Sequence, residues 1–233
     1  MDLPIIDVVL IAIVAGVAWC VSGEGAWGAG LTCLCVLFGG MLAMNFFEPV
    51  ANWLGRIALI GEACADVVAL VGLFAFFVFL LRWATDNLSP TSIDIDGRLY
   101  QIIRLGFAVA TGYITMAFLL TALHTTPLPR NFIGFTPERN NFLEVTAPDR
   151  WWLGFNQYVS EVVFRRNKIF DGPELAPVPG KKKEIWPSFT IRYATRREMY
   201  GRPAKKVGLV PAPVEGQKAG GAAPAPAAPG GGF

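Results

Sequence analysis

Four long apolar stretches restrict what this chain can fold into more than any other feature. They cover about residues 3–22, 26–47, 63–81 and 105–123. Crossing the hydrocarbon core of a bilayer takes about 20 apolar helical residues, which matches the length of these stretches. Backbone amides in hydrocarbon must find hydrogen-bond partners within their own segment, so long and uniformly apolar runs are expected to be helical. The sequence therefore predicts four transmembrane helices.

The composition agrees with a membrane protein. Apolar residues make up 53% of the 233 residues and charged residues only 16%, against about 25% charged residues in soluble domains. Residues 1–123 contain four Arg, no Lys and nine acidic residues, whereas residues 124–233 contain sixteen basic and nine acidic residues. The chain thus has an acidic apolar half and a basic half. Four cysteines spread over apolar stretches exclude a disulfide-rich secreted domain. No basic residue precedes the first stretch, so we expect a retained span rather than a cleaved signal peptide.

The connections predict how the helices are arranged. Only residues 23–25 separate the first two stretches, so these helices should turn back at once and pack as an antiparallel hairpin. Residues 49–57 mix apolar and polar types, as an interfacial segment does. Small residues that allow close helix contact recur at helical spacing, and examples are Gly39 with Ala43, Gly106 with Ala110, and Ala108 with Gly112. We therefore expect an all-α membrane protein with a compact bundle of four transmembrane helices over residues 1–123.

Residues 124–206 are expected to lie outside the membrane and to include one amphipathic helix at about 149–165. Asp149 follows a proline and is the predicted N-cap. One helical stripe of this segment holds Trp151, Phe155, Tyr158, Val159, Val162 and Val163. Such a helix either lies flat on the membrane or packs under the bundle, and Trp151, Trp152 and Phe155 are the predicted contacts with the interface or a partner.

The C-terminal tail is expected to be largely irregular. Residues 181–206 hold nine basic and two acidic residues, and Lys181, Lys182 and Lys183 are candidates for contact with lipid or a partner. The alternative is a solvated charged tail. Residues 207–233 consist mostly of Ala, Pro and Gly, which bury too little surface to offset the entropy of ordering, so this part should be disordered.

No catalytic or metal-binding motif can be identified. His124 is the only histidine, and the sequence shows no partner for it. Cys33 and Cys35 are two residues apart on a predicted helix, so they face different sides and cannot hold a metal together. The signatures HExxH and GxSxG and a glycine-rich phosphate loop are missing from the sequence. We predict no enzyme, no cofactor and no bound metal, and nucleic acid is not an expected partner.

Three carboxylates are candidates for an intramembrane polar site: Asp7, Glu62 and Asp66. A carboxylate at membrane depth is costly and is kept only where something compensates. Asp7 and Asp66 each lie about one turn into an apolar stretch, and both stretches begin on the same side, so the two should lie at similar depth and could bind a cation or proton. Alternatively, each acid faces headgroup water at the positive end of its helix dipole.

The layout of the first half resembles a known family. It combines a first span that starts at Asp7, a tight hairpin into a long second span, the run NFFEPVANWL at 45–54, and the run DGRLYQIIRLG at 96–106, which leads into a fourth span with Gly112. Over about residues 1–123 this is similar to the CvpA family, the colicin V production proteins of bacterial inner membranes. The first hairpin departs from the family pattern, because residues 22–27 lack the basic residues that usually accompany a glycine there.

The resemblance implies a non-enzymatic, multi-pass protein of the bacterial inner membrane, linked to toxin production or export and to envelope and biofilm function. In addition to the lipid bilayer, the resemblance implies export-machinery or envelope proteins as partners. A second interpretation is a subunit of a channel or transporter for ions or small solutes, which would be a homo-oligomer because four helices rarely enclose a pore alone. The orientation stays open, since arginines close to the membrane are equally divided between the two sides.

Overall fold

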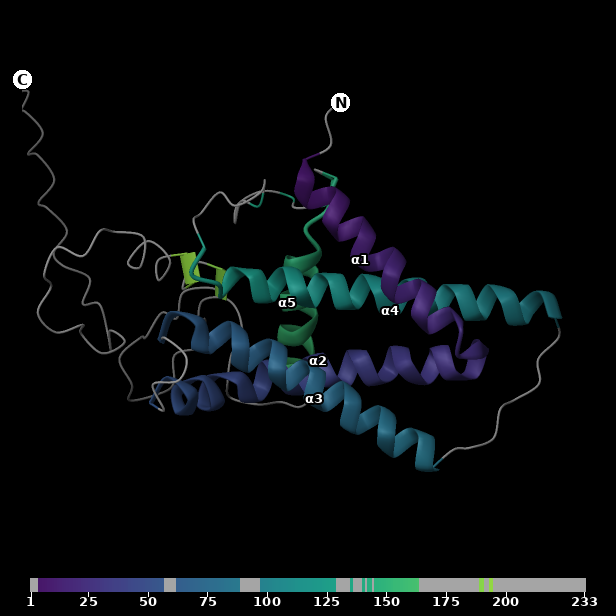
Figure 1. Ribbon diagram of the computed structural model, residues 1–233, viewed down its shortest axis with the longest axis horizontal. Coiled ribbons are helices and arrows are strands. Elements are labelled where there is room, and N and C mark those ends of the chain that lie inside the picture. Colours follow the sequence, from purple (N-terminus) through teal and green to yellow (C-terminus); the bar gives the residue numbers. More distant parts are fainter. Residues whose placement is uncertain are drawn as a thin grey trace, which may run out of the picture.

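The computed structural model describes residues 4–56, 62–88, 97–128 and 145–163, single residues between 135 and 143, and two short pieces at 189–190 and 193–194. Five α-helices and one π-helical turn are formed in this part of the chain (Figure 1). They are α1 (Ile5–Ser22), α2 (Gly25–Arg56), α3 (Glu62–Leu88), α4 (Gly97–His124), α5 (Pro148–Tyr158) and η1 (Val159–Val163). Helices α1 to α4 are each long and apolar enough to cross a membrane, which confirms the predicted all-α membrane fold.

Three of the four long helices continue beyond the apolar stretch that predicted them. Helix α2 runs through Pro49 to Arg56, so the predicted interfacial residues form its last turns. These turns stay helical because Ala51 is buried in the core, while Trp53 on the other side is exposed. Helix α3 extends to Leu88 and α4 begins as early as Gly97. These three helices are therefore longer than the about 20 residues that a bilayer crossing takes.

Helix α1 packs mainly on α4, although α2 follows it directly in the chain. The chain reverses at Gly23 and Glu24 as predicted, but α1 makes few contacts with α2. Helix α2 packs most extensively on α3 and also along α4, so the helices lie in the order α1, α4, α2, α3 (Figure 1). This order separates the first and third helices of the chain.

Small residues explain two of the helix contacts. A Cβ atom on Gly112 of α4 would lie 2.6 Å from the backbone oxygen of Val14 in α1. A Cβ atom on Gly39 of α2 would lie 3.1 Å from the backbone nitrogen of Val78 in α3. Gly106, which has the same predicted role, is different, because a Cβ atom there would have no atom of another segment within 4 Å. Two of the predicted small-residue sites thus mark close helix contacts, and the third does not.

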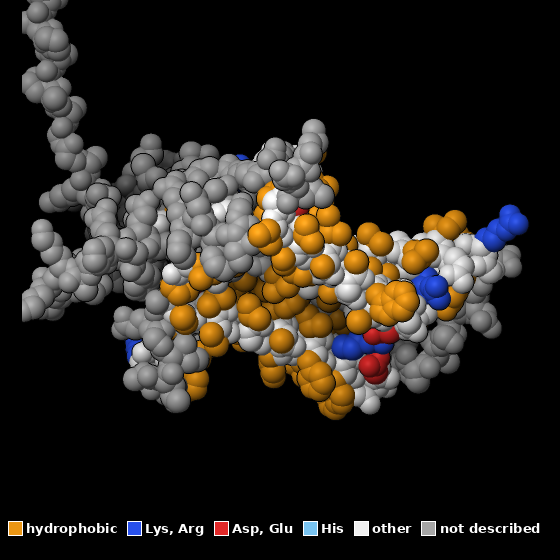
Figure 2. All heavy atoms as spheres, turned by 45° about the horizontal axis from the view of Figure 1, so that its top comes forward, with side chains coloured by type: hydrophobic (Ala, Val, Ile, Leu, Met, Phe, Trp, Pro, Cys, Tyr) orange, Lys and Arg blue, Asp and Glu red, His pale blue; other side chains and the backbone are white. Residues whose placement is uncertain are grey.

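The outer surface of the bundle is strongly apolar. Figure 2 shows hydrophobic side chains over most of the described surface on one face, with a charged group toward one end. The exposed side chains on the long helices include Trp19, Phe38, Phe46, Phe76, Phe79 and Trp83. An apolar surface of this extent is not compatible with water, whereas lipid covers it without cost. The chain is a multi-pass membrane protein.

Candidate functional site

Helix α5 packs on the side of the bundle and runs across the long helices rather than along them (Figure 1). Trp152 inserts between α2 and α4. Its indole meets the ring of Phe118 edge to face, with ring centroids 6.0 Å apart. Gly40 makes room for it, because a Cβ atom there would lie 2.7 Å from the indole. A residue other than glycine at position 40 would therefore push α5 outward.

The two neighbouring tryptophans of α5 have opposite roles. Trp152 is 4% exposed and belongs to the core, whereas Trp151 is 72% exposed. Phe155 is also on the exposed side, so only two of the three predicted contact residues face outward. The α-helix ends at Tyr158 and continues as the π-helical turn η1 to Val163, so the predicted segment 149–165 is helical through most of its length.

The start of α5 is joined to the end of α4 by a buried pair of ionisable side chains. His124 Nε2 lies 2.8 Å from Asp149 Oδ2, and neither side chain has any exposed surface. An ionised carboxylate can only accept, so with Asp149 in that form the ring N–H of His124 is the donor. Phe135 covers the imidazole edge to face, with centroids 5.0 Å apart. Among the described residues, His124 Nδ1 and Asp149 Oδ1 have no hydrogen-bond partner.

This pair corrects two predictions from the sequence. His124 has a partner, and Asp149 is not the N-cap of α5. The N-cap is Ala147, which makes no side-chain hydrogen bond, and Pro148 occupies the first turn, where its missing N–H costs nothing. Asp149 is therefore free to bind His124. The two residues are 25 positions apart, so their contact could not be identified without knowing where α5 packs. The sequence held only a weak signal, which was a single histidine followed further along the chain by an aspartate after a proline.

Asp7 is buried at the start of α1 and binds a backbone amide of the segment that follows α4. The N–H of Leu143 donates to Asp7 Oδ1 at 3.1 Å, and Asp7 is 1% exposed. Leu143 has a φ of 53°, an uncommon conformation for a branched side chain. Asp7 Oδ2 has no hydrogen-bond partner within the described part of the chain. The carboxylate is thus half satisfied.

Two of the three predicted intramembrane acids, Asp7 and Asp66, lie on helices that are not neighbours. Asp66 is also buried, at the start of α3. Helices α1 and α3, which carry Asp7 and Asp66, are separated by α4 and α2. Glu62 is the first residue of α3, and its side chain lies outside the described structure, as do Lys181, Lys182 and Lys183.

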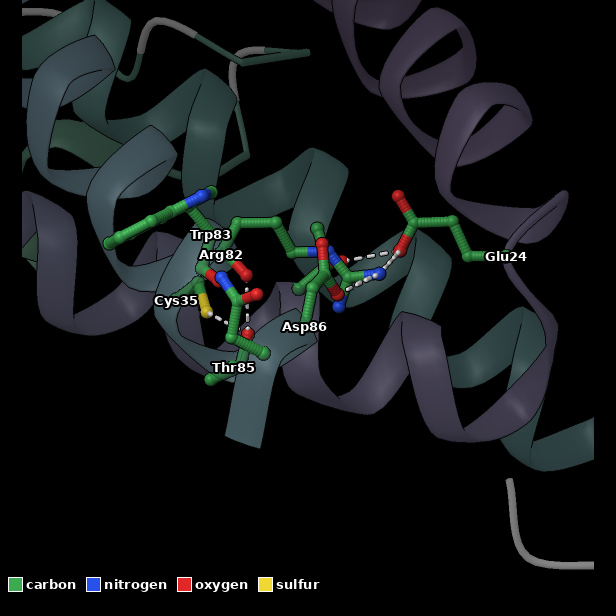
Figure 3. A network of polar contacts seen from close by, with 8 residues as sticks. Glu24, Cys35, Arg82, Trp83, Thr85 and Asp86 are labelled. Atoms are coloured by element: carbon green, nitrogen blue, oxygen red, sulfur yellow. Dashed lines mark hydrogen bonds and ion pairs between the residues drawn. The ribbon is translucent and has the colours of Figure 1, made fainter. Parts of the chain in front are cut away.

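A second polar cluster lies at the opposite end of the bundle, where α1 turns into α2 (Figure 3). Arg82 of α3 lies between two carboxylates, with its Nη2 3.0 Å from Glu24 Oε2 and 3.3 Å from Asp86 Oδ1. Thr32 donates to the same oxygen of Glu24 at 2.6 Å. Nearby, the Cys35 sulfur is 3.8 Å from the Thr85 hydroxyl. The cluster ties the first turn of the chain to the end of α3.

The chemistry available to these clusters is limited. The ion pairs of Arg82 are partly exposed, and pairs of this kind contribute about 0–1 kcal/mol to stability. No group of three or more His, Cys, Asp or Glu side chains that could hold a metal ion occurs among the described residues. The His124–Asp149 pair is fully buried, so a substrate could not reach it without movement of α5. Its geometry suits a structural contact that joins α5 to α4.

Comparison with known proteins gives one match. A family model described as "Colicin V production protein" matches residues 6–143, which is more than half of the chain. The match begins one residue before Asp7 and ends at Leu143, and a hydrogen bond joins Asp7 to Leu143. Helix α5 and everything after it lie outside the match. No curated protein and no solved structure matches the chain.

Proposed function

The chain belongs to the colicin V production protein family, and on that basis we propose that it is a non-enzymatic scaffold of the bacterial inner membrane. In this role it supports toxin production or export by binding a protein of the export machinery or the envelope. Biofilm and envelope effects would follow from the same contact. The four apolar helices hold the scaffold in the bilayer, and the binding residues are Lys181, Lys182 and Lys183 in the basic segment.

One observation carries this proposal: residues that precede the three lysines in the sequence, and residues that follow them, are buried against the bundle. Before them, Val159 and Ser160 are buried beside α5. After them, Phe189 is buried in the core and meets the Phe47 ring, with centroids 6.3 Å apart. Lys183 precedes Phe189 by six residues, which limits its distance from that anchor to about 21 Å.

This arrangement favours a scaffold over a catalyst. Phe47 lies at the end of the apolar part of α2, so Phe189, which meets it, lies near one end of the spans. An anchor there would hold the three lysines near the same surface of the membrane. Three adjacent positive charges on a short tethered segment attract an acidic protein surface and raise the rate of its association. The buried His124–Asp149 pair joins α4 to α5, and the buried Asp7 binds the amide of Leu143 in the segment that follows α4.

The test replaces Lys181, Lys182 and Lys183 together by Gln in a colicin V-producing strain that lacks its own family member. We expect less colicin V in the medium and loss of a co-purifying protein, at unchanged membrane levels of the variant. The matched control replaces Lys205, Lys206 and Lys218 by Gln, which removes the same charge further along the tail. Equal colicin V output from both variants would contradict the proposal. Deletion of residues 149–206 is unsuitable, because Trp152 and Phe189 belong to the core.

A channel or transporter subunit, active as a homo-oligomer, is the second candidate. Burial of Asp7 in an apolar helix, with Oδ2 lacking a hydrogen-bond partner among the described residues, favours it. Asp7→Asn keeps the oxygen that accepts from Leu143, so the fold should survive. A channel would then lose ion flux in reconstituted vesicles with Asp7→Asn and with Asp66→Asn, whereas the exposed control Asp86→Asn would conduct normally. If the protein is a scaffold, the unsubstituted protein itself would show no ion flux, and the Asp7→Asn variant would still support colicin V production.

A further inference from the structure

Helix α5 has two faces of different character. The inner face carries Asp149, Trp152, Leu153 and Asn156, all buried against the bundle. The outer face carries Trp151, Phe155 and Tyr158, and it continues into the exposed Val162 of η1. These residues recur at helical spacing, and Tyr158 is 59% exposed. The inner face thus holds the polar residues with defined partners, while the outer face is aromatic and has no covering among the described residues.

The contacts of the inner face fix the level of α5 relative to the membrane. Asp149 is bound to His124, the last residue of α4. Trp152 meets Phe118, which lies six residues further into α4, a distance of about 9 Å along the helix. It also fits against Gly40, seven residues before the end of the apolar part of α2, or about 10 Å. Helix α5 therefore lies just inside one end of the spans, where hydrocarbon gives way to headgroups.

The outer face of α5 is exposed and apolar, as is the outer surface of the long helices. Because α5 packs on the sides of α2 and α4 through its buried residues, its exposed outer face points away from the bundle. Phe38 and Phe46 of α2 are also exposed on the long helices. Water at this position would leave a row of aromatic rings uncovered next to lipid.

We propose that the outer face of α5, formed by Trp151, Phe155 and Tyr158, binds the lipid of the membrane at the boundary between headgroups and acyl chains, together with Val162 of η1. Trp and Tyr prefer this level because their rings are apolar and their N–H and O–H groups reach water or headgroups. A helix that lies across the spans with one apolar face is the usual form of an interfacial helix. The lipid contact and the partner contact proposed above use different residues, so either can fail alone.

The test places the photo-crosslinking residue p-benzoylphenylalanine at position 151 or 158 of the full-length protein in native membranes. Position 79 on α3, where Phe79 is exposed on a span, is the positive control. Position 152 is the buried control. We expect phospholipid adducts at positions 79, 151 and 158, detected by mass spectrometry, and their loss at position 152.

Two outcomes would overturn the proposal. Adducts with another protein chain at positions 151 and 158 would make this face a protein-binding surface. No adduct at these positions, while position 79 labels lipid, would place the face in water. If a variant at position 152 fails to insert, position 153 provides the same control, because Leu153 is 1% exposed. A protein adduct would leave the role of the three lysines untouched.

Discussion

The contact between His124 and Asp149 joins the membrane domain to α5 through two side chains. Asp149→Ala leaves a buried imidazole without its partner, and this should destabilise the protein by about 2–4 kcal/mol. Asp149→Asn keeps a group that can bond to the ring and should cost less. Thermal unfolding of the purified protein in detergent micelles measures the difference.

A matched acid is available for comparison. Asp86→Ala removes a partly exposed partner of Arg82 and should change stability by less than about 1 kcal/mol. Similar unfolding temperatures for Asp149→Ala and Asp86→Ala would show that the buried pair does not fasten α5. A double-mutant cycle with His124→Ala then separates the pair from the packing of each residue.

At the level of whole helices, close packing of α1 on α4 depends on a single missing Cβ atom. Gly112→Ala brings a methyl group against the backbone of Val14, which cannot move without shifting α1. We expect a loss of about 1–3 kcal/mol, typical of overpacking. The control is Gly106→Ala on the same helix, where space is open and the alanine should be neutral or stabilise by up to about 1 kcal/mol. If both variants lose the same stability in detergent unfolding, the effect comes from helix propensity and not from the contact with Val14.

The arrangement of the whole molecule predicts which segments share a side of the membrane. With four spans, the turn at Gly23 and the start of α4 lie on one side, and the end of α4 lies on the other. In a Cys20→Ser background, Gly23→Cys and Arg98→Cys should therefore react with a charged maleimide from one side only. Thr126→Cys should react from the opposite side in inverted vesicles. Labelling of positions 98 and 126 from the same side would show that α4 does not span.

Residue patterns predicted the spans and one face of α5, but not the contacts between elements. The four apolar stretches predicted α1 to α4, and the stripe from Trp151 to Val163 predicted an amphipathic helix without deciding whether it faces the membrane or the bundle. Trp151 and Tyr158 of that stripe are exposed, whereas Val159 is buried. The stripe could not show that Trp152, one position further, fills the gap at Gly40. Asp7 and Asp66 were identified as buried acids, but their separation on α1 and α3 depends on helix order.

Reading the residues in order is enough to establish that this protein is helical and lies in a membrane, because the length and uniformity of an apolar run decide how a segment meets lipid. The packing of α1 on α4, the contact of His124 with Asp149 and the inward face of α5 became known only from the assembled helices. In a bilayer, lipid tails solvate an apolar side chain as well as another helix does, so hydrophobicity cannot select a neighbour. The neighbour of a helix is instead determined by complementary surfaces, where glycines such as Gly40 and Gly112 let another helix approach closely. This complementarity can be recognised only when the helices are packed together.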